Sequence, residues 1–164
     1  MDFTHLKNLT TLIFSNINFK SHTQESLYEL GQVYSNIQNL AYIECNFPNV
    51  IDMTFLHRGF RHLKQFRLDH KIASDRFLQN LLNINHDLET IIFRNCIVTG
   101  DRWFDVLVNK LKGRSITSLS IHSQNFTFEG ISKFLNTDIF KSDTLKVNIS
   151  YDGTISIPFC INFV

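Results

Sequence analysis

The feature that most constrains the fold of this chain is a short apolar pattern that recurs along it. In LETIIFRNC, residues 88–96, apolar residues stand at offsets 0, 3, 5 and 8. Similar patterns begin at positions 9, 40, 63 and 116, so the intervals between starts are 31, 23, 25 and 28 residues. A degraded sixth copy begins near Thr144. A period of about 20–50 residues indicates a row of stacked structural units.

Each copy of the pattern predicts a β-strand, because side chains alternate between the two faces of a strand. In residues 88–94, Ile91 and Phe93 point to one face, and Thr90, Ile92 and Arg94 point to the other. The first set would build a core, and the second would meet solvent or a partner. The corresponding residues of the five clear copies predict one aligned apolar row: Leu12, Ile43, Phe66, Ile91 and Leu119.

The segments between the strand patterns carry apolar residues at helical spacing. Residues 24–37, 51–60, 74–84, 99–113 and 127–135 each place several apolar side chains on one helical face. Ser74 and Thr99 are suited to cap helix starts, and Gly113 is suited to end a helix. Each unit is therefore predicted to contain a strand, a turn, a helix and a return.

Residues 88–98, LETIIFRNCIV, match the pattern L-x-x-L-x-L-x-x-N/C-x-L at every position, with Cys96 at the N/C place. The copies that begin at 9, 40 and 63 depart from it there, with Ile17, Pro48 and Lys71. The chain resembles the leucine-rich repeat family, most closely its ribonuclease-inhibitor-like and cysteine-containing subclasses, and the latter is familiar from F-box proteins. This resemblance implies an α/β solenoid of about five to six repeats, shaped as a horseshoe arc. A parallel sheet would line the concave side and helices the convex side, in one domain over residues 1–164.

The two ends of such a stack need polar caps. Residues 153–164 are apolar at alternate positions and are predicted to form a C-terminal capping strand. Only eight residues precede the first repeat, so its outer end is expected to lack a cap. Two alternatives follow: the protein self-associates through this end, or the chain is part of a longer protein.

Charge and cysteine content narrow the partners and the compartment. The net charge is +1, from 16 basic and 15 acidic residues, which gives no argument for nucleic acid or membrane binding. The basic residues of segment 57–71 are divided between a helix and a strand, so we favour a solvated face over a phosphate-binding or acidic-partner patch. Three widely spaced cysteines form no disulfide framework. With no signal peptide or apolar span, a reducing cytoplasmic or nuclear location is expected.

No motif of a catalytic, metal or cofactor site occurs in the sequence. The glycine-rich phosphate-binding loops, the nucleophile elbow and the H-E-x-x-H zinc motif are all missing. Trp103 stands on the apolar face of its predicted helix and is expected in the core. We therefore expect a protein that is not an enzyme and that needs no cofactor or metal.

The function expected from the resemblance is the binding of a protein partner on the concave face of the sheet. The residues predicted to contact that partner are Tyr42, Glu44, Arg67, Asp69, Ile92, Arg94 and His122. The F-box likeness implies descent from the substrate-recognition arm of a ubiquitin ligase, although no F-box segment is found in this sequence. The alternatives are an inhibitor or decoy of the ribonuclease-inhibitor type, and a fragment of a longer repeat protein without independent function.

Overall fold

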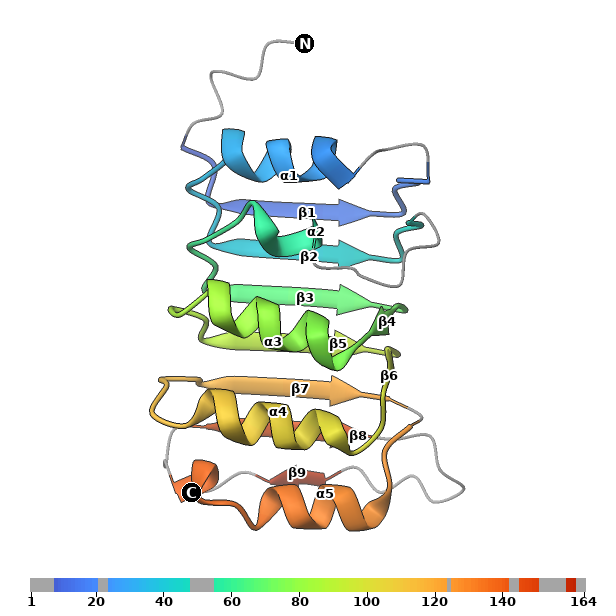
Figure 1. Cartoon of the computed structure of the whole chain (residues 1–164), viewed down its shortest axis with the longest axis vertical. Coiled ribbons are helices and arrows are strands. Elements are labelled where there is room, and N and C mark those ends of the chain that lie inside the picture. Colours follow the sequence, from blue (N-terminus) through green and yellow to red (C-terminus); the bar gives the residue numbers. More distant parts are fainter. Residues whose placement is uncertain are drawn as a thin grey trace.

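The computed structural model describes residues 8–20, 24–47, 55–123, 125–141, 145–150 and 159–161. Its main feature is a mixed α/β arrangement in which a sheet and a layer of helices run side by side along the molecule (Figure 1). The sheet has the order β1-β2-β3-β5-β7-β8-β9 in the described part of the chain, and its first six strands are parallel. The strands are β1 (Thr11–Ser15), β2 (Asn39–Ile43), β3 (Gln65–Asp69), β5 (Thr90–Arg94), β7 (Ser118–His122), β8 (Lys146–Ser150) and β9 (Phe159–Ile161).

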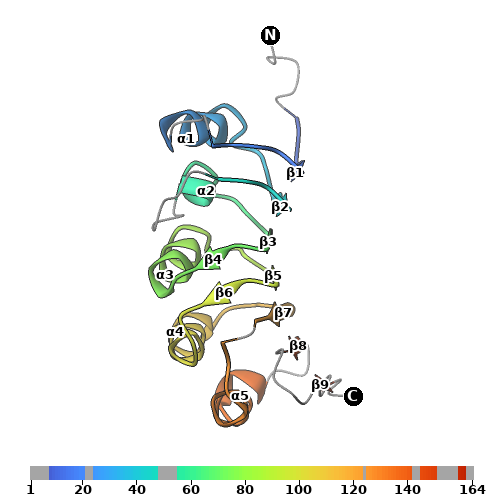
Figure 2. The ribbon, with the colours of Figure 1, turned by 90° about the vertical axis from the view of Figure 1, so that its right-hand side faces the viewer.

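The helices all lie on one side of this sheet (Figure 2). The strands form a shallow arc, and the helices occupy its outer side. Two short strands, β4 (Ile72–Ala73) and β6 (Ile97–Val98), pair with each other on the way from the sheet to the helices. The helices are α1 (Gln24–Val33), α2 (Phe55–Arg58), α3 (Asp75–Ile84), α4 (Arg102–Leu111) and α5 (Phe128–Leu135), followed by the 3₁₀ turn η2 (Asp138–Lys141).

The register of the sheet aligns one core residue from each parallel strand. Leu12, Phe66, Ile91 and Leu119 lie in one row, as predicted. In β2, however, the place in this row belongs to Leu40, and the prediction for Ile43 is wrong. Two apolar rows therefore face the helices: Leu12, Leu40, Phe66, Ile91, Leu119 and Val147, and beside them Phe14, Tyr42, Leu68, Phe93, Ile121 and Ile149.

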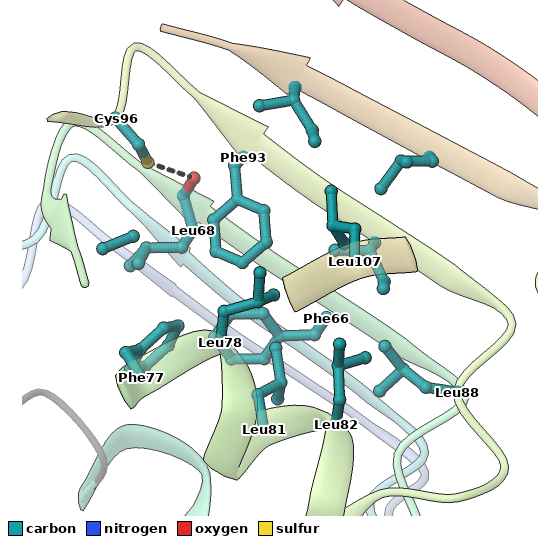
Figure 3. Close-up of a cluster of buried hydrophobic side chains, with 14 of the residues drawn as sticks. Phe66, Leu68, Phe77, Leu78, Leu81, Leu82, Leu88, Phe93, Cys96 and Leu107 are labelled. Atoms are coloured by element: carbon teal, nitrogen blue, oxygen red, sulfur yellow. Dashed lines mark hydrogen bonds between the residues drawn. The ribbon is translucent and has the colours of Figure 1, made fainter. Parts of the chain in front are cut away.

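The core between the sheet and helices is rich in aromatic side chains (Figure 3). Phe66 and Phe77 lie with their ring centroids 5.9 Å apart, and Phe93 packs edge-on against Trp103 at 4.8 Å. All four side chains are completely buried, so Trp103 is a core residue, as predicted. This burial of apolar area is the main stabilising contribution to the fold.

Helix ends follow local capping chemistry in two of the predicted places. The Ser74 hydroxyl accepts a hydrogen bond from the Phe77 N–H at the start of α3, and Gly113 takes a positive φ of 76° just after α4. Thr99 does not cap α4; its hydroxyl bonds the Asp75 carboxylate instead. The prediction for Thr99 is wrong because the helix starts three residues later than its sequence pattern suggests.

At the C-terminal end, β9 pairs antiparallel with β8, with Asn148 opposite Cys160. This strand covers the outer edge of β8. The rest of the predicted capping segment, residues 153–158 and 162–164, lies outside the described residues. The assignment of the whole chain to one domain remains a prediction.

Candidate functional site

The sheet face turned away from the helices carries the candidate site, and we call it the open face. Its side chains come from the strand positions that alternate with the core rows. The strand register aligns them in three columns that run across all six parallel strands. The columns are Thr11, Asn39, Gln65, Thr90, Ser118 and Lys146; Ile13, Ala41, Arg67, Ile92, Ser120 and Asn148; and Ser15, Ile43, Asp69, Arg94, His122 and Ser150.

An ion pair lies at the centre of the open face. The Arg67 guanidinium donates two hydrogen bonds to Asp69 on the same strand, at 3.0 Å from Nε to Oδ1 and 2.6 Å from Nη2 to Oδ2. The Asp69 side chain is only 6% exposed, so Arg67 covers it. These hydrogen bonds raise the pKa of Arg67. Such a two-pronged pair is geometrically specific, and it neutralises both charges within the protein.

Arg94 is the next residue along the column from Asp69. It is exposed, and no described carboxylate forms an ion pair with it. Both oxygens of Asp69 are already bound by Arg67. The Arg94 guanidinium is therefore positioned to receive an acidic group from outside.

The open face changes character along the row of strands. At the β1–β2 end it is apolar, with Ile13 58% exposed and Ala41 and Ile43 half-buried. Beyond Arg94 it carries hydroxyl, amide, imidazole and amine groups, contributed by Ser118, Ser120, His122, Lys146, Asn148 and Ser150. An apolar patch and a polar, positively charged patch thus stand on either side of the Arg67–Asp69 pair.

Five of the seven predicted contact residues lie on the open face: Arg67, Asp69, Ile92, Arg94 and His122. Tyr42 does not. It is 1% exposed, stacks on Phe14 and belongs to a core row, and this burial raises its pKa well above the ordinary range. Glu44 follows the end of β2 in a left-handed turn, with φ of 52°, so it lies beside the open face rather than at its centre. The predictions for these two residues are wrong.

The reason is a three-residue error in locating the second copy of the pattern. Ile37, Leu40, Tyr42 and Cys45 occupy offsets 0, 3, 5 and 8, which was the signal in the sequence that could have found the correct copy. A strand has a side-chain period of two, so an odd shift exchanges its two faces. The corrected register replaces Tyr42 and Glu44 on the open face by Ala41 and Ile43, which the sequence reasoning missed.

The turns after the strands form one rim of the open face. Asn16, Glu44, His70 and Asn95 all have positive φ at the same place of their units. The next residue in two of these units is a buried cysteine whose thiol donates to the carbonyl of the preceding strand. The Cys96 Sγ lies 3.3 Å from Leu68 O (Figure 3), and the Cys45 Sγ lies 3.4 Å from Phe14 O. These cysteines bind adjacent units together.

The basic segment 57–71 forms no common patch. His57 is completely buried against Phe77, and Lys64 pairs with Glu89 at 3.8 Å. Arg58 lies over the ring of Tyr28, and Lys71 lies over the ring of Phe47. The charges are thus distributed among separate contacts, which agrees with the preference for a solvated face.

Within the described ranges, no three His, Cys, Asp or Glu side chains gather in a way that could hold a metal ion. None of the described helices is both long and apolar enough to cross a membrane. Comparison of the chain with models of known protein families, with curated proteins and with solved structures found no match. The residues and geometry of this chain are therefore the basis for any functional proposal.

Proposed function

We propose that this chain is a non-catalytic, leucine-rich-repeat-type solenoid that binds a protein partner on its open face. Six parallel strands follow one another in chain order, which supports the repeat assignment. The same turn with a thiol-to-carbonyl hydrogen bond recurs at Cys45 and Cys96, at the place where the cysteine-containing repeats carry their cysteine. Solenoids of this kind commonly use their concave surface for binding.

The observation that carries the proposal is the composition of the open face. Exposed Ile13 and half-buried Ile43 offer apolar contact, and Arg94 offers a cation without a described acidic partner. A partner that fits would present an apolar side chain beside a carboxylate. Complementary charge of this kind directs association and fixes register. Both functional contexts, ubiquitin-ligase substrate recognition and inhibition of an enzyme, would use this same surface, and a cytoplasmic or nuclear location fits both.

The test uses a photo-crosslinking amino acid at two matched positions of the full chain. One replaces Ile92 in the middle of the open face, and the other replaces exposed Gln79 on helix α3. After irradiation in cells, we expect one protein to be crosslinked from position 92 and not from position 79. The reverse pattern would place the binding surface on the helices and contradict the proposal.

A charge reversal then tests the role of the open face in that complex. We expect Arg94→Glu to weaken binding of the crosslinked protein by about tenfold or more, because removal of a close interface charge pair costs more than about 1.4 kcal/mol. Arg102→Glu on α4 is the matched control, since it makes the same change on the helix side. Arg67 is left intact because its loss would strand the buried Asp69 carboxylate. Equal weakening by both variants would argue against open-face binding.

A further inference from the structure

The two ends of the sheet differ in what covers them. At one end, β9 pairs with β8. At the other end, the structure describes no strand on the outer side of β1. Leu12 and Phe14 of β1 are only half-buried, whereas Phe66 and Phe93, which occupy the same rows in the centre, are completely buried. The β1 edge is thus an open continuation of both the sheet and the core.

Backbone hydrogen bonding fixes which groups of β1 point outward. The Asn39 N–H donates to Thr10 O, and the Asn16 N–H donates to Ile43 O. Even-numbered residues of this strand therefore face β2, because alternate residues of a strand direct their N–H and C=O groups to opposite sides. The N–H and C=O groups of Thr11, Ile13 and Ser15 consequently point away from the sheet.

The strand also lacks the features that normally protect an edge. Its sequence, TLIFS, contains no charge and no proline. Natural edge strands usually carry such features to prevent pairing with other chains. β1 is instead composed of residues that favour strands.

We infer that β1 pairs antiparallel with β1 of a second copy of this chain, so that two sheets join into one across a two-fold axis at Ile13. In this register, Thr11 lies opposite Ser15 of the second copy, Leu12 opposite Phe14, and Ile13 opposite Ile13. Every pair matches in face and in polarity. The outward N–H and C=O groups of Thr11, Ile13 and Ser15 would all be satisfied, since each of these pairs exchanges two hydrogen bonds.

Helix α1 supports the same occupant. Gly31 faces α2, where it touches the backbone of Gly59. Val33 is two residues further, about 200° around the helix, and therefore lies on the side away from α2. It is 62% exposed, so a second α1 would cover it. Glu29 lies on this side as well, and its repulsion from its symmetry mate makes the association stronger at higher salt.

The experiment is sedimentation of the full chain over a range of concentrations. We expect a reversible dimer, and we expect Ile13→Lys to raise its dissociation constant by about tenfold or more because two like charges would lie directly opposite. Ile72→Lys is the matched control, because Ile72 is 60% exposed compared with 58% for Ile13 but lies on β4, away from the edge. The control should dimerise like the parent chain.

Two measurements make the result specific to β1. Hydrogen exchange of Thr11, Ile13 and Ser15 amides should slow as concentration rises, while those of Leu12 and Phe14 stay protected throughout. Oxidised Ile13→Cys should give a dimer linked through position 13, since opposed residues in a hydrogen-bonded pair are about 5.5 Å apart between Cα atoms. Ile72→Cys should not give the corresponding link.

Three outcomes would overturn the inference. The first is a parent chain that is monomeric at every concentration, and the second is a dimer that survives Ile13→Lys unchanged. The third is a monomer that dimerises only when residues 1–7 are deleted, which would show that the chain covers its own edge. None of these results bears on open-face binding, which the crosslinking experiment tests separately.

Discussion

The β1–β2 end and the β3–β7 centre of the sheet follow one sequence pattern but differ in how completely they bury it. In the centre, Phe66 and Phe93 lie between strands on both sides and under helices of ten residues, α3 and α4. At the end, Leu12 and Phe14 have a neighbouring strand on one side only. The same offsets therefore produce full burial in one region and half-burial in the other.

This difference teaches that the stability of a unit in such a row depends on its neighbours as much as on its own residues. Apolar burial scales with the area removed from water, and an outer unit removes less. The helices differ too: α1 and α2 meet through the backbones of Gly31 and Gly59, whereas Phe104 of α4 packs through its side chain against Phe134 of α5. The two regions should consequently respond differently to mutation.

The largest effect is expected for truncation in the centre. Phe93→Ala removes a ring that contacts Phe66, Phe77 and Trp103, and we expect a loss of about 3–5 kcal/mol in the free energy of unfolding. Phe14→Ala at the end should cost about 1–2 kcal/mol, because its ring is already half-exposed. Urea unfolding followed by circular dichroism measures both. Equal losses would show that the end is as well packed as the centre.

An intermediate effect is expected where α1 meets α2. A Cβ added to Gly59 would lie 2.5 Å from Tyr28 O and 2.8 Å from the Cα of Gly31. These are backbone atoms, so the helices must separate, and Gly59→Ala should destabilise the protein by about 1–3 kcal/mol. Gln79→Ala on the exposed side of α3 is the control and should change stability little.

A double-mutant cycle distinguishes a close helix contact from a purely local effect. If Gly31 and Gly59 share one contact, Gly31→Ala should add little once Gly59→Ala has separated the helices. Strictly additive losses in urea unfolding would contradict the backbone-to-backbone packing of α1 and α2.

The centre could be predicted from the sequence more fully than the end, for a physical reason. The copies that begin at Leu63, Leu88 and Ile116 keep large aliphatic or aromatic residues at each core offset, so their register follows from period-two alternation. The second copy carries Tyr42 in the core and Ile43 on the open face, which reverses the usual relation of polarity to burial. Placing its start at Ile37 gives intervals from 9 to 37 to 63 of 28 and 26 residues, a more regular spacing.

The electrostatics of the open face could be predicted only in part. The alternation placed Arg67, Asp69 and Arg94 on one face, and the structure agrees. The sequence could not reveal that Arg67 binds both oxygens of Asp69 and leaves Arg94 as the available cation, because that choice depends on side-chain rotamers. Likewise, Asn16 and Asn95 suit a left-handed turn, but Glu44 in the same conformation has no residue preference behind it.

The smallest effect at neutral pH, and the most direct test of the shared turn, concerns Cys96. Burial raises the pKa of its thiol to about 12, compared with an ordinary value of about 8.5. Between these values the unfolded chain releases this proton while the folded chain keeps it, so the unfolded state binds fewer protons. The stability that Cys96 contributes is therefore complete below about pH 8.5 and is lost as the pH rises towards 12.

Cys96→Ser isolates this contribution, because a serine hydroxyl can still donate to Leu68 O but does not titrate in this range. We expect urea unfolding to show little difference between the two proteins at pH 7. Above about pH 9 the parent chain should lose stability more steeply than the variant. Burial also raises the pKa of Cys45, so Cys45→Ser should flatten the pH dependence in the same direction. Parallel pH profiles for parent and variants would mean that these thiols are not held in the turn as neutral donors, and the equivalence of the end and central turns would fail.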